Sequence, residues 1–578
     1  MIDKIKELEK LSRLLDPQQN QRDNWNNEVL NYSNNLINNV DSAKAYNFSE
    51  ENGKEIYNLD ITENPTELST LLESTSKNID KVGINATSSG HMGYIPGGGL
   101  YPSALGDYVA AINNHYAGIF FASPGAVRLE NMLIRWMCNL MGYSNNSTGN
   151  LTSGGSIANL IAIVTAREAH NIKARDIERS VIYLSEQAHH SIQKAIRIAG
   201  LSEAHLRYIP LDDNLRLSVI ELEKTIVEDK KNGLIPFFVN ASFGTTNTGT
   251  IDPIKGIGDI AEKHNLWFHI DAAYGGFFKL VSELNLKFQG IEKANSITLD
   301  PHKTLFLPFG TGTILVKDKD RLLKAHHYFA DYMQDSIDDN EEISPADISP
   351  ELTKHFRGLR MWLPLKLFGL MPFRAALEEK LYLVRYFYDK IKQTKGFEVG
   401  PEPELSIAIF RFIPIEEDAN SFNKKLIQSI QKDGRIFLSS TTINGVFWIR
   451  IAVVIFRTHL EQIDLLLKII NEKVEELSEI RINVIIDYYM TYRWAENIEL
   501  TLEKLVEVTN TTNYIEIVTK LEKYSNYTEL DISMYIHEIA NPSYADLVGI
   551  INSRLKIYKD KDAIEDLNLA LKKIKVSN

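Results

Sequence analysis

A lysine follows a short apolar run near the middle of the chain, directly behind a histidine. The stretch SITLDPHKTLF, residues 296–306, has the composition of a buried strand that ends before Pro301, His302 and Lys303. A lysine is almost never fully buried unless another group pairs with it or reacts with it. Its amine can form an imine with a carbonyl compound, which removes the charge. Lys303 is therefore a candidate for covalent chemistry.

Three further polar motifs lie in the same part of the chain. Asp271 ends the apolar run LWFHID, and His189 follows the run VIYLSE at the start of a helical segment. In TSGGSIANLIAIVTARE a Gly-Gly-Ser turn opens a helix, and the free N–H groups of a helix start favour an anion. Taken singly, each motif has an ordinary structural explanation. Asp271 would form a salt bridge, His189 a cap or packing contact, and the Gly-Gly-Ser turn a capped helix start.

The segments around these motifs alternate between predicted strands and helices. Helical segments at 190–200 and 254–265 separate several short runs rich in Val, Ile and Phe. The predicted strands are 181–186, 235–244, 266–271, 296–300 and 312–318. Such alternation predicts an α/β fold with a mainly parallel sheet, in which ligands bind beyond the carboxyl ends of the strands. We therefore expect the four motifs to face one edge of the sheet.

A phosphate cradle, an aspartate, a histidine and a lysine at one sheet edge suit pyridoxal 5′-phosphate (PLP). The phosphate would bind the helix start, the aldehyde would form a Schiff base with the lysine, and the ring nitrogen would pair with the aspartate. A protonated ring nitrogen makes the ring an electron sink. Raising the ring-nitrogen pKa by about two units needs roughly 2.7 kcal/mol, which one well-placed buried carboxylate can supply.

The motifs TSGGS, SEQAHHS, GTT, HIDAAYGG and DPHK occur in the same order as in a known family. The chain resembles the group II pyridoxal-phosphate decarboxylases, and the aromatic-L-amino-acid decarboxylase branch most closely, over about residues 15–478. The resemblance implies the type I PLP-dependent transferase fold, also called aspartate aminotransferase-like. It implies a homodimer with active sites at the subunit interface. It also implies decarboxylation of an L-amino acid, aromatic substrates favoured, to the primary amine and carbon dioxide.

The resemblance also implies a role for single residues, and no metal. The residues that it places around the cofactor are Gly155, Ser156 and His302 for the phosphate, Asp271 for the ring nitrogen, Ala273, Thr246 and His189 for the ring, and Lys303 for the Schiff base. Tyr332 stands in an ADYM stretch that opens a polar loop. The family pattern makes Tyr332 the donor that protonates the substrate carbon after carbon dioxide leaves.

Several positions depart from the aromatic branch. Gly97 stands where animal enzymes have a threonine, Thr304 replaces a tryptophan, and Lys354 with His355 replaces an arginine pair. Gly97 is expected to alter the substrate side of the pocket, so a non-aromatic substrate such as glutamate or 2,4-diaminobutyrate stays an alternative. Another is an aldehyde synthase that couples decarboxylation to oxidative deamination, although relatives with that activity replace the loop tyrosine or the stacking histidine. A non-catalytic PLP-binding protein is the least favoured alternative.

Composition limits the partners and the compartment. The chain has 578 residues, of which 44% are hydrophobic, and its formal net charge is -13. An acidic balance argues against nucleic acid or an anionic membrane as partner. One cysteine, Cys138, excludes an internal disulfide and fits a reducing compartment. The N-terminus lacks the apolar core of a signal peptide, and no run is long enough to cross a membrane, so we expect a cytoplasmic protein.

Changes of pattern along the chain predict four regions. The first is an N-terminal helical dimerisation segment, which includes a helix at 65–80 with Pro65 in its first turn. A large PLP-binding α/β domain, a small C-terminal α+β domain and a helical extension of unknown role follow. The predicted limits are 1–90, 91–355, 356–478 and 479–578.

Overall fold

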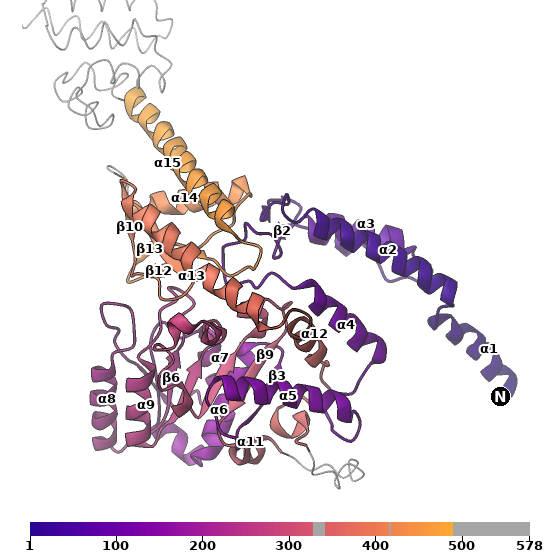
Figure 1. Ribbon diagram of the computed structural model, residues 1–578, viewed down its shortest axis with the longest axis horizontal. Helices are drawn as coiled ribbons and strands as arrows, with labels where there is room; N and C mark the ends of the chain where they lie inside the picture. The colour runs from indigo at the N-terminus through magenta and orange to yellow at the C-terminus, as the bar shows by residue number, and fades with distance from the viewer. Residues whose placement is uncertain (328–341, 415–417, 489–578) are drawn as a thin grey trace, which may run out of the picture. The chain divides into compact units, whose positions relative to one another are not determined.

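The computed structural model describes residues 1–327, 342–414 and 418–488 (Figure 1). The chain divides into two compact units. One joins Met1–Ile413 to Asp418–Leu467, and the other joins Pro414–Glu417 to Lys468–Asn578. Tyr332 and most of the predicted helical extension lie outside the described residues. The limits of the four predicted regions stay a prediction.

The first unit contains a seven-stranded sheet in the order β3-β9-β8-β7-β6-β4-β5. Its strands are β3 Thr148–Thr152, β4 Ser180–Leu184, β5 His205–Tyr208, β6 Ile235–Ser242, β7 Trp267–Asp271, β8 Ser296–Leu299 and β9 Gly312–Val316. Strands β5, β4, β6, β7 and β8 are parallel, and β9 is antiparallel to both β8 and β3. Strand β3 therefore points the same way as β8. The prediction of a mainly parallel α/β sheet is confirmed.

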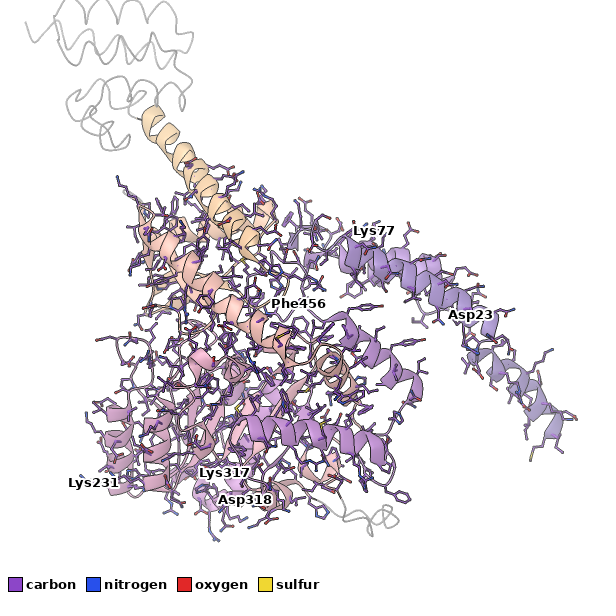
Figure 2. All side chains as sticks on the ribbon, in the orientation of Figure 1. Asp23, Lys77, Lys231, Lys317, Asp318 and Phe456 are labelled. Carbon is purple, nitrogen blue, oxygen red and sulfur yellow. The ribbon has the colours of Figure 1, made fainter. Side chains whose placement is uncertain are left out.

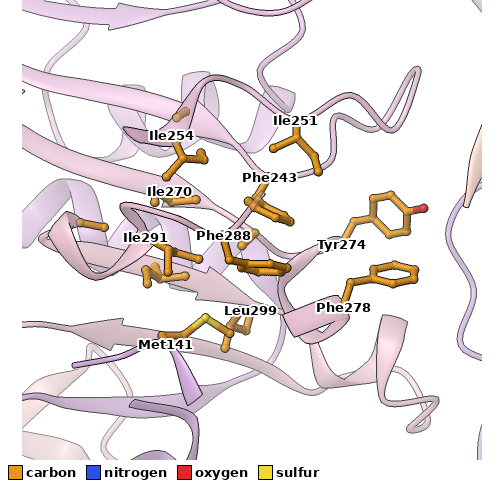
Figure 3. Close-up of a cluster of buried hydrophobic side chains, with 14 of the residues drawn as sticks. Met141, Phe243, Ile251, Ile254, Ile270, Tyr274, Phe278, Phe288, Ile291 and Leu299 are labelled. Carbon is orange, nitrogen blue, oxygen red and sulfur yellow. The ribbon is translucent and has the colours of Figure 1, made fainter. Parts of the chain in front are cut away.

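The central strands are buried on both faces, which explains their nearly continuous apolar sequences. Alternate residues of β7 enter different cores: Trp267 packs with the residues of α6, whereas Phe268 and Ile270 pack in the larger core on the other face. Phe243 and Phe288 stack in that larger core with ring centroids 4.0 Å apart (Figure 3).

Helices connect and cover these strands (Figure 1). Those that follow the strands or lie beside them are α4 Tyr101–Asn113, α5 Pro124–Leu140, α6 Gly155–Ala169, α7 His190–Ile198, α8 Val219–Lys231, α9 Ile254–His264, α10 Pro301–Thr304, α11 Lys319–His326 and α12 Gly358–Phe368. The helices predicted at 190–200 and 254–265 correspond to α7 and α9 and are confirmed.

A second, four-stranded antiparallel sheet has the order β10-β11-β13-β12. Its strands are β10 Phe397–Val399, β11 Ile407–Phe412, β12 Ser439–Ile443 and β13 Val446–Ala452. Helices α13 Leu370–Gln393 and α14 Ala419–Asp433 pack against it, and α15 Leu460–Tyr488 follows. None of the described helices combines the length and the apolar composition that a bilayer crossing needs.

The N-terminal helices are α1 Ile2–Ser12, α2 Gln19–Asn38 and α3 Leu68–Thr75, and none of them has a buried residue. Helix α3 confirms the predicted helix, but the placement of Pro65 in its first turn is wrong. Glu67 is extended at φ -65° and ψ 141°, so the helix begins only at Leu68. A π-helical turn at Ser76–Asp80 follows, and its Lys77, which is labelled in Figure 2, pairs with Glu55 at 2.7 Å.

Candidate functional site

A cavity of about 290 Å³ lies beyond the carboxyl ends of β3, β4, β6, β7 and β8. Eight of the predicted site residues line it: Gly155, Ser156, His189, Thr246, Asp271, Ala273, His302 and Lys303. Parallel strands end at the same edge, which brings together residues more than a hundred positions apart in sequence. The ninth, Tyr332, lies outside the described residues.

Lys303 is carried by the single turn α10, directly after β8. Pro301 opens this turn, and the Lys303 N–H donates to the Asp300 carbonyl at 2.9 Å. The side chain of Lys303 is 21% exposed and that of Asp300 only 3%, and Lys303 Nζ lies 3.0 Å from Asp300 Oδ2. The amine of Lys303 therefore faces the cavity with one buried carboxylate beside it.

The start of α6 fits a phosphate. The first N–H groups of a helix lack intrahelical partners, and here they open onto the cavity at Gly155 and Ser156. A Cβ on Gly155 would lie 3.0 Å from Asp300 Oδ2 and 3.4 Å from the Ala273 Cβ, so a side chain would fill the cradle. The imidazole of His302 also lines the cavity and can add a side-chain donor of the kind that phosphate requires.

His302 is oriented by a hydrogen bond to the backbone. Its Nδ1 lies 2.6 Å from the carbonyl oxygen of Thr311, so Nδ1 must carry a proton and donate it. Burial lowers the pKa of His302, and the nearby carboxylate of Asp300 opposes that shift. In the neutral ring Nε2 can only accept, so a phosphate bound at Nε2 would favour the imidazolium form.

Asp271 ends β7 with its carboxylate buried beside the cavity. Oδ1 accepts the N–H of Ala273 at 3.2 Å, and Oδ2 accepts the side-chain amide N–H of Asn159 at 3.0 Å. Each carboxylate oxygen can accept two hydrogen bonds and here accepts one, so both oxygens keep acceptor capacity for a ligand. A protonated ring nitrogen is a suitable partner for this group.

His189 caps α7, and its ring lines the cavity. Its Nδ1 lies 2.7 Å from the hydroxyl of Ser191 and accepts the Ser191 N–H at 3.3 Å. Burial lowers the pKa of His189, and Lys303 lowers it further while Asp271 acts in the opposite direction. The neutral ring with its proton on Nε2 satisfies both contacts of Nδ1.

Arg450 of β13 connects the cavity wall to the smaller sheet. Its Nε donates to the carbonyl of Thr246 at 2.8 Å, and one terminal nitrogen donates to the carbonyl of Tyr94 at 2.9 Å. Burial lowers the pKa of Arg450 to about 10. The side chain of Arg450 thus holds the backbone carbonyls of both Thr246 and Tyr94 by hydrogen bonds.

The four departures from the aromatic branch are absent from the described cavity lining. A Cβ on Gly97 would lie 2.3 Å from the His302 carbonyl oxygen and 2.7 Å from that of Lys303, so Gly97 packs against the backbone of the lysine turn. Thr304 donates to the Tyr274 carbonyl at 3.0 Å. Lys354 is buried 2.8 Å from Glu130, and His355 lies 3.3 Å from Asp107.

The structure adds cavity residues that sequence reasoning missed, chiefly Asn159, Ser191 and Asp300. Asn159 stands four positions after Gly155 on α6, so both lie on one helical face, and this spacing could have identified it. Asp300 belongs to the DPHK motif, directly before the proline. Ser191 is two residues from His189, but nothing in the sequence pattern predicts its hydrogen bond.

The chain is similar to known proteins over most of its length. A model of the pyridoxal-dependent decarboxylase conserved domain matches residues 51–413. An aromatic-L-amino-acid decarboxylase of Bacillus atrophaeus is 33% identical over 423 residues, which cover 72% of this chain and 88% of that protein. A phenylacetaldehyde synthase of Petunia hybrida is 30% identical over 381 residues, which cover 62% of this chain and 75% of that protein. The crystal structure of Oryza sativa TDC with PLP and tryptamine matches the fold with a TM-score of 0.76 at 21% identity, covering 80% of this chain and 99% of that chain.

Proposed function

We propose that this protein converts an aromatic L-amino acid to the primary amine. The chain belongs to the pyridoxal-dependent decarboxylases and is therefore a PLP-dependent amino-acid decarboxylase of the type I fold. Lys303 is the proposed cofactor lysine. The observation that carries the proposal is one cavity that joins the amine of Lys303, the carboxylate of Asp271 and the N-terminal end of α6.

When bound, PLP supplies an aldehyde that condenses with amines and a ring that draws electrons from the substrate carbon. Lys303 would provide the enzyme's amine. Asp300 Oδ2, 3.0 Å from Nζ, would hold the ammonium in place and accept its proton when the amine reacts. His302, with Gly155 and Ser156, would hold the phosphate.

Two residues would control the ring. Asp271 would accept a hydrogen bond from the ring nitrogen, and its negative charge would hold the proton on that nitrogen. His189 would stack on one ring face, in the orientation that Ser191 fixes by two contacts to Nδ1. Ala273 would pack against the ring and Thr246 would lie beside it, and both line the cavity.

Two exposed aromatic side chains near the cavity support an aromatic substrate. The Phe309 ring is 62% exposed, and its centroid lies 5.8 Å from that of His302. Tyr94 is 59% exposed, and its backbone carbonyl accepts a hydrogen bond from Arg450, as that of the cavity residue Thr246 does. Large aromatic side chains near a cavity offer contact area to a ring-bearing substrate. Similarity to an aromatic-L-amino-acid decarboxylase supports the same choice.

A panel of amino acids tests the substrate class. The purified protein would be given tyrosine, tryptophan, dopa, glutamate and 2,4-diaminobutyrate, and carbon dioxide and amine would be measured together. We expect turnover of the aromatic amino acids and not of the other two. Exclusive turnover of glutamate or 2,4-diaminobutyrate would refute the aromatic assignment but leave the decarboxylase assignment intact. Phe309→Ala should raise KM for an aromatic substrate more than it lowers kcat.

An aldehyde synthase is a second candidate, favoured by the similarity to phenylacetaldehyde synthase. Tyr332, which lies outside the described residues, is the proposed proton donor to the substrate carbon after carbon dioxide leaves. A prompt proton yields the amine, whereas a late one leaves an electron-rich carbon that molecular oxygen can oxidise. His189 would influence the same choice.

The variant Tyr332→Phe distinguishes these outcomes. It is expected to keep carbon dioxide release but to divert product from amine toward aldehyde, ammonia and hydrogen peroxide. Amine and aldehyde would be quantified in the same reaction on the best substrate of the panel. Unchanged amine formation at the parent rate would mean that another group supplies the proton. Aldehyde as the main product of the parent protein would make it an aldehyde synthase.

The N-terminal helices support a homodimer. Helix α2 has an apolar set whose side chains are 39–50% exposed, and α1 has a second set whose side chains are 53–61% exposed. These side chains are Ile5, Leu8 and Leu11 of α1 and Trp25, Val29, Leu30, Leu36 and Ile37 of α2. Exposed apolar patches of this kind mark protein interfaces. A second copy of the chain is the proposed partner, and molar mass from light scattering should be twice that of one chain.

Location and domain limits remain proposals as well. A cytoplasmic location is supported by the single cysteine, Cys138, which is free and buried. Fractionation of cells that express the full chain would test it. The proposed domain limits at 90, 355 and 478 would be tested by limited proteolysis, with cleavage expected near these positions before the cores are cut.

A further inference from the structure

A row of buried polar side chains lies behind Asp271. Alternate residues of a strand face the same side, so Trp267 and His269 share the face of β7 that carries Asp271. Asn159 of α6 and Ser296 of β8 bond to this row, and the four side chains behind the carboxylate are each at most 1% exposed. Buried polar groups are costly unless they are hydrogen-bonded. The direction of each hydrogen bond therefore matters.

The donors and acceptors of this row can be assigned in order. The Trp267 Nε1–H can only donate, and Ser296 Oγ accepts it at 2.8 Å. The hydroxyl hydrogen of Ser296 is left for His269 Nδ1, also at 2.8 Å. Burial lowers the pKa of His269 to about 4, so near neutral pH the ring holds one proton, on Nε2. This Nε2–H donates to Asn159 Oδ1 at 3.0 Å.

The amide of Asn159 is fixed in one orientation. Its Oδ1 accepts a second hydrogen bond, from the hydroxyl of Thr298 at 2.6 Å. Its Nδ2 donates to Asp271 Oδ2 and to Ser191 Oγ, both at 3.0 Å. If the amide were reversed, its oxygen would face the carboxylate oxygen, and two acceptors would repel each other. All four hydrogen-bonding positions of the amide are used, and its N–H groups point toward the cavity.

The two side-chain N–H groups of Asn159 connect it, directly or through Ser191, to the two side chains proposed to act on the cofactor ring. One ends directly on the Asp271 carboxylate. The other ends on Ser191 Oγ, whose own hydrogen is then free for His189 Nδ1 at 2.7 Å. One amide thereby stabilises the negative charge of the aspartate and selects the histidine tautomer with its proton on Nε2.

We propose that Asn159 is the positioning residue of this site: it aims the charged Asp271 carboxylate at the ring nitrogen of PLP and, through Ser191, sets the tautomer of His189. The inference rests on the proposed function, because it assumes that Asp271 contacts the ring nitrogen. A carboxylate that loses a donor becomes more basic and takes the shared proton from the ring nitrogen. Asn159 thus acts on the ring through two other residues.

The test uses PLP labelled with ¹⁵N at the ring nitrogen, bound to the protein without substrate. The ¹⁵N chemical shift reports whether that nitrogen is protonated. Asn159→Leu keeps a similar volume and removes the donors. We expect its shift to move toward the neutral value, and the PLP dissociation constant to rise roughly tenfold, as for the loss of one hydrogen bond to a charged group. A shift equal to that of the parent across the pH range would overturn the proposal.

Two milder variants keep the test decisive if Asn159→Leu does not fold. Thr298→Val removes one donor to Asn159 Oδ1 and should move the ring ¹⁵N shift by a smaller amount in the same direction. Ser191→Ala should leave that shift unchanged but alter the ¹⁵N signals of His189, which can be followed without cofactor. A parent-like ring shift in Thr298→Val, or unaltered His189 signals in Ser191→Ala, would contradict the proposal.

Asp271→Asn, measured in parallel, separates this inference from the proposed function. If Asp271→Asn leaves the ring nitrogen protonated, the role proposed for Asp271 is wrong. If the ring nitrogen loses its proton in Asp271→Asn but keeps it in Asn159→Leu, only the role of Asn159 is wrong. Asn423→Leu is the matched control, since Asn423 is also fully buried but bonds to backbone of β11 and α14. It should lower thermal stability without moving the ring shift.

Discussion

The seven-stranded sheet and the N-terminal helices differ in how far their apolar side chains are buried. All five residues of β7 are buried, and β4 and β8 of the same sheet are buried along their whole length. In α1, α2 and α3 not one residue is buried, although Trp25, Val29 and Leu30 are large and apolar. The sheet has a core of its own, whereas the helices present an apolar surface without a core.

This difference in burial indicates that the sheet and the N-terminal helices have different functions. The sheet edge needs fixed positions, because a carboxylate, an amine and a helix start must meet around one small molecule. The exposed faces of α1 and α2 gain stability only when another surface covers them. We therefore assign the chemistry to the sheet and the assembly to the helices. Substitutions in the two regions should have separable effects.

The largest effect is expected in the sheet, from Asp271→Asn. The amide keeps the shape but removes the charge that holds the ring nitrogen protonated. We expect kcat to fall by roughly a hundredfold or more, as when a preorganised charge-stabilising group is lost. Cofactor affinity should fall less, and the molar mass of the assembly should not change. Turnover close to that of the parent would remove the electrostatic role of Asp271.

A second effect compares one core residue with one exposed residue. Ile270 of β7 is fully buried, and Leu30 of α2 is 50% exposed. Ile270→Ala should lower the free energy of unfolding by about 2–5 kcal/mol, because it leaves a cavity. Leu30→Ala should change the unfolding of the sheet by less than about 0.5 kcal/mol. Urea titration of both variants provides the comparison, and equal losses would mean that α2 shares the core of the sheet.

A third effect is the loss of stability in acid through two buried histidines. Burial lowers the pKa of His269 and of His91 from 6.5 to about 4 in the folded protein. Above pH 6.5 both rings are neutral in the folded and unfolded chain, so neither lowers the free energy of unfolding. As the pH falls from 6.5 to about 4 only the unfolded chain takes up these protons, and each histidine removes up to roughly 3 kcal/mol.

His91 allows that acid effect to be tested by substitution. Its ring nitrogens have no hydrogen-bond partner among the described residues, and its ring meets Phe437 edge-on at 5.6 Å. His91→Phe should therefore keep the packing and reduce the difference in unfolding free energy between pH 7 and pH 5. An undiminished difference would show that His91 is already charged in the folded protein at pH 5.

The smallest effect is expected in the helices. Val29→Glu and Trp25→Glu place a charge on the exposed apolar face of α2, and each should raise the dimer dissociation constant by about tenfold. Sedimentation velocity at low protein concentration would measure it. Lys231→Glu at the end of α8, an exposed position in the sheet region (Figure 2), is the matched control and should leave assembly unchanged. Dissociation that is equal in all three variants would refute the assignment of assembly to α2.

The central strands could be predicted because buried parallel strands have continuous apolar sequences. Edge strands β3, TGNLT, and β5, HLRY, were not predicted, because each is short and mixes polar residues with apolar ones. The main site residues could be predicted because each directly follows a strand or opens a helix. The pairing of Asn159 with Asp271 could not, since it joins residues 112 positions apart and depends on how α6 packs on the sheet.

The most direct test of the central assignment is to locate the lysine that holds the cofactor. The purified protein with bound PLP would be reduced with borohydride, digested and mapped by mass spectrometry. We expect the cofactor on the peptide that contains Lys303, no label in Lys303→Ala, and full label in Lys317→Ala, which alters an exposed lysine just after β9 (Figure 2). A cofactor label on any lysine other than Lys303 would contradict the assignment of the site.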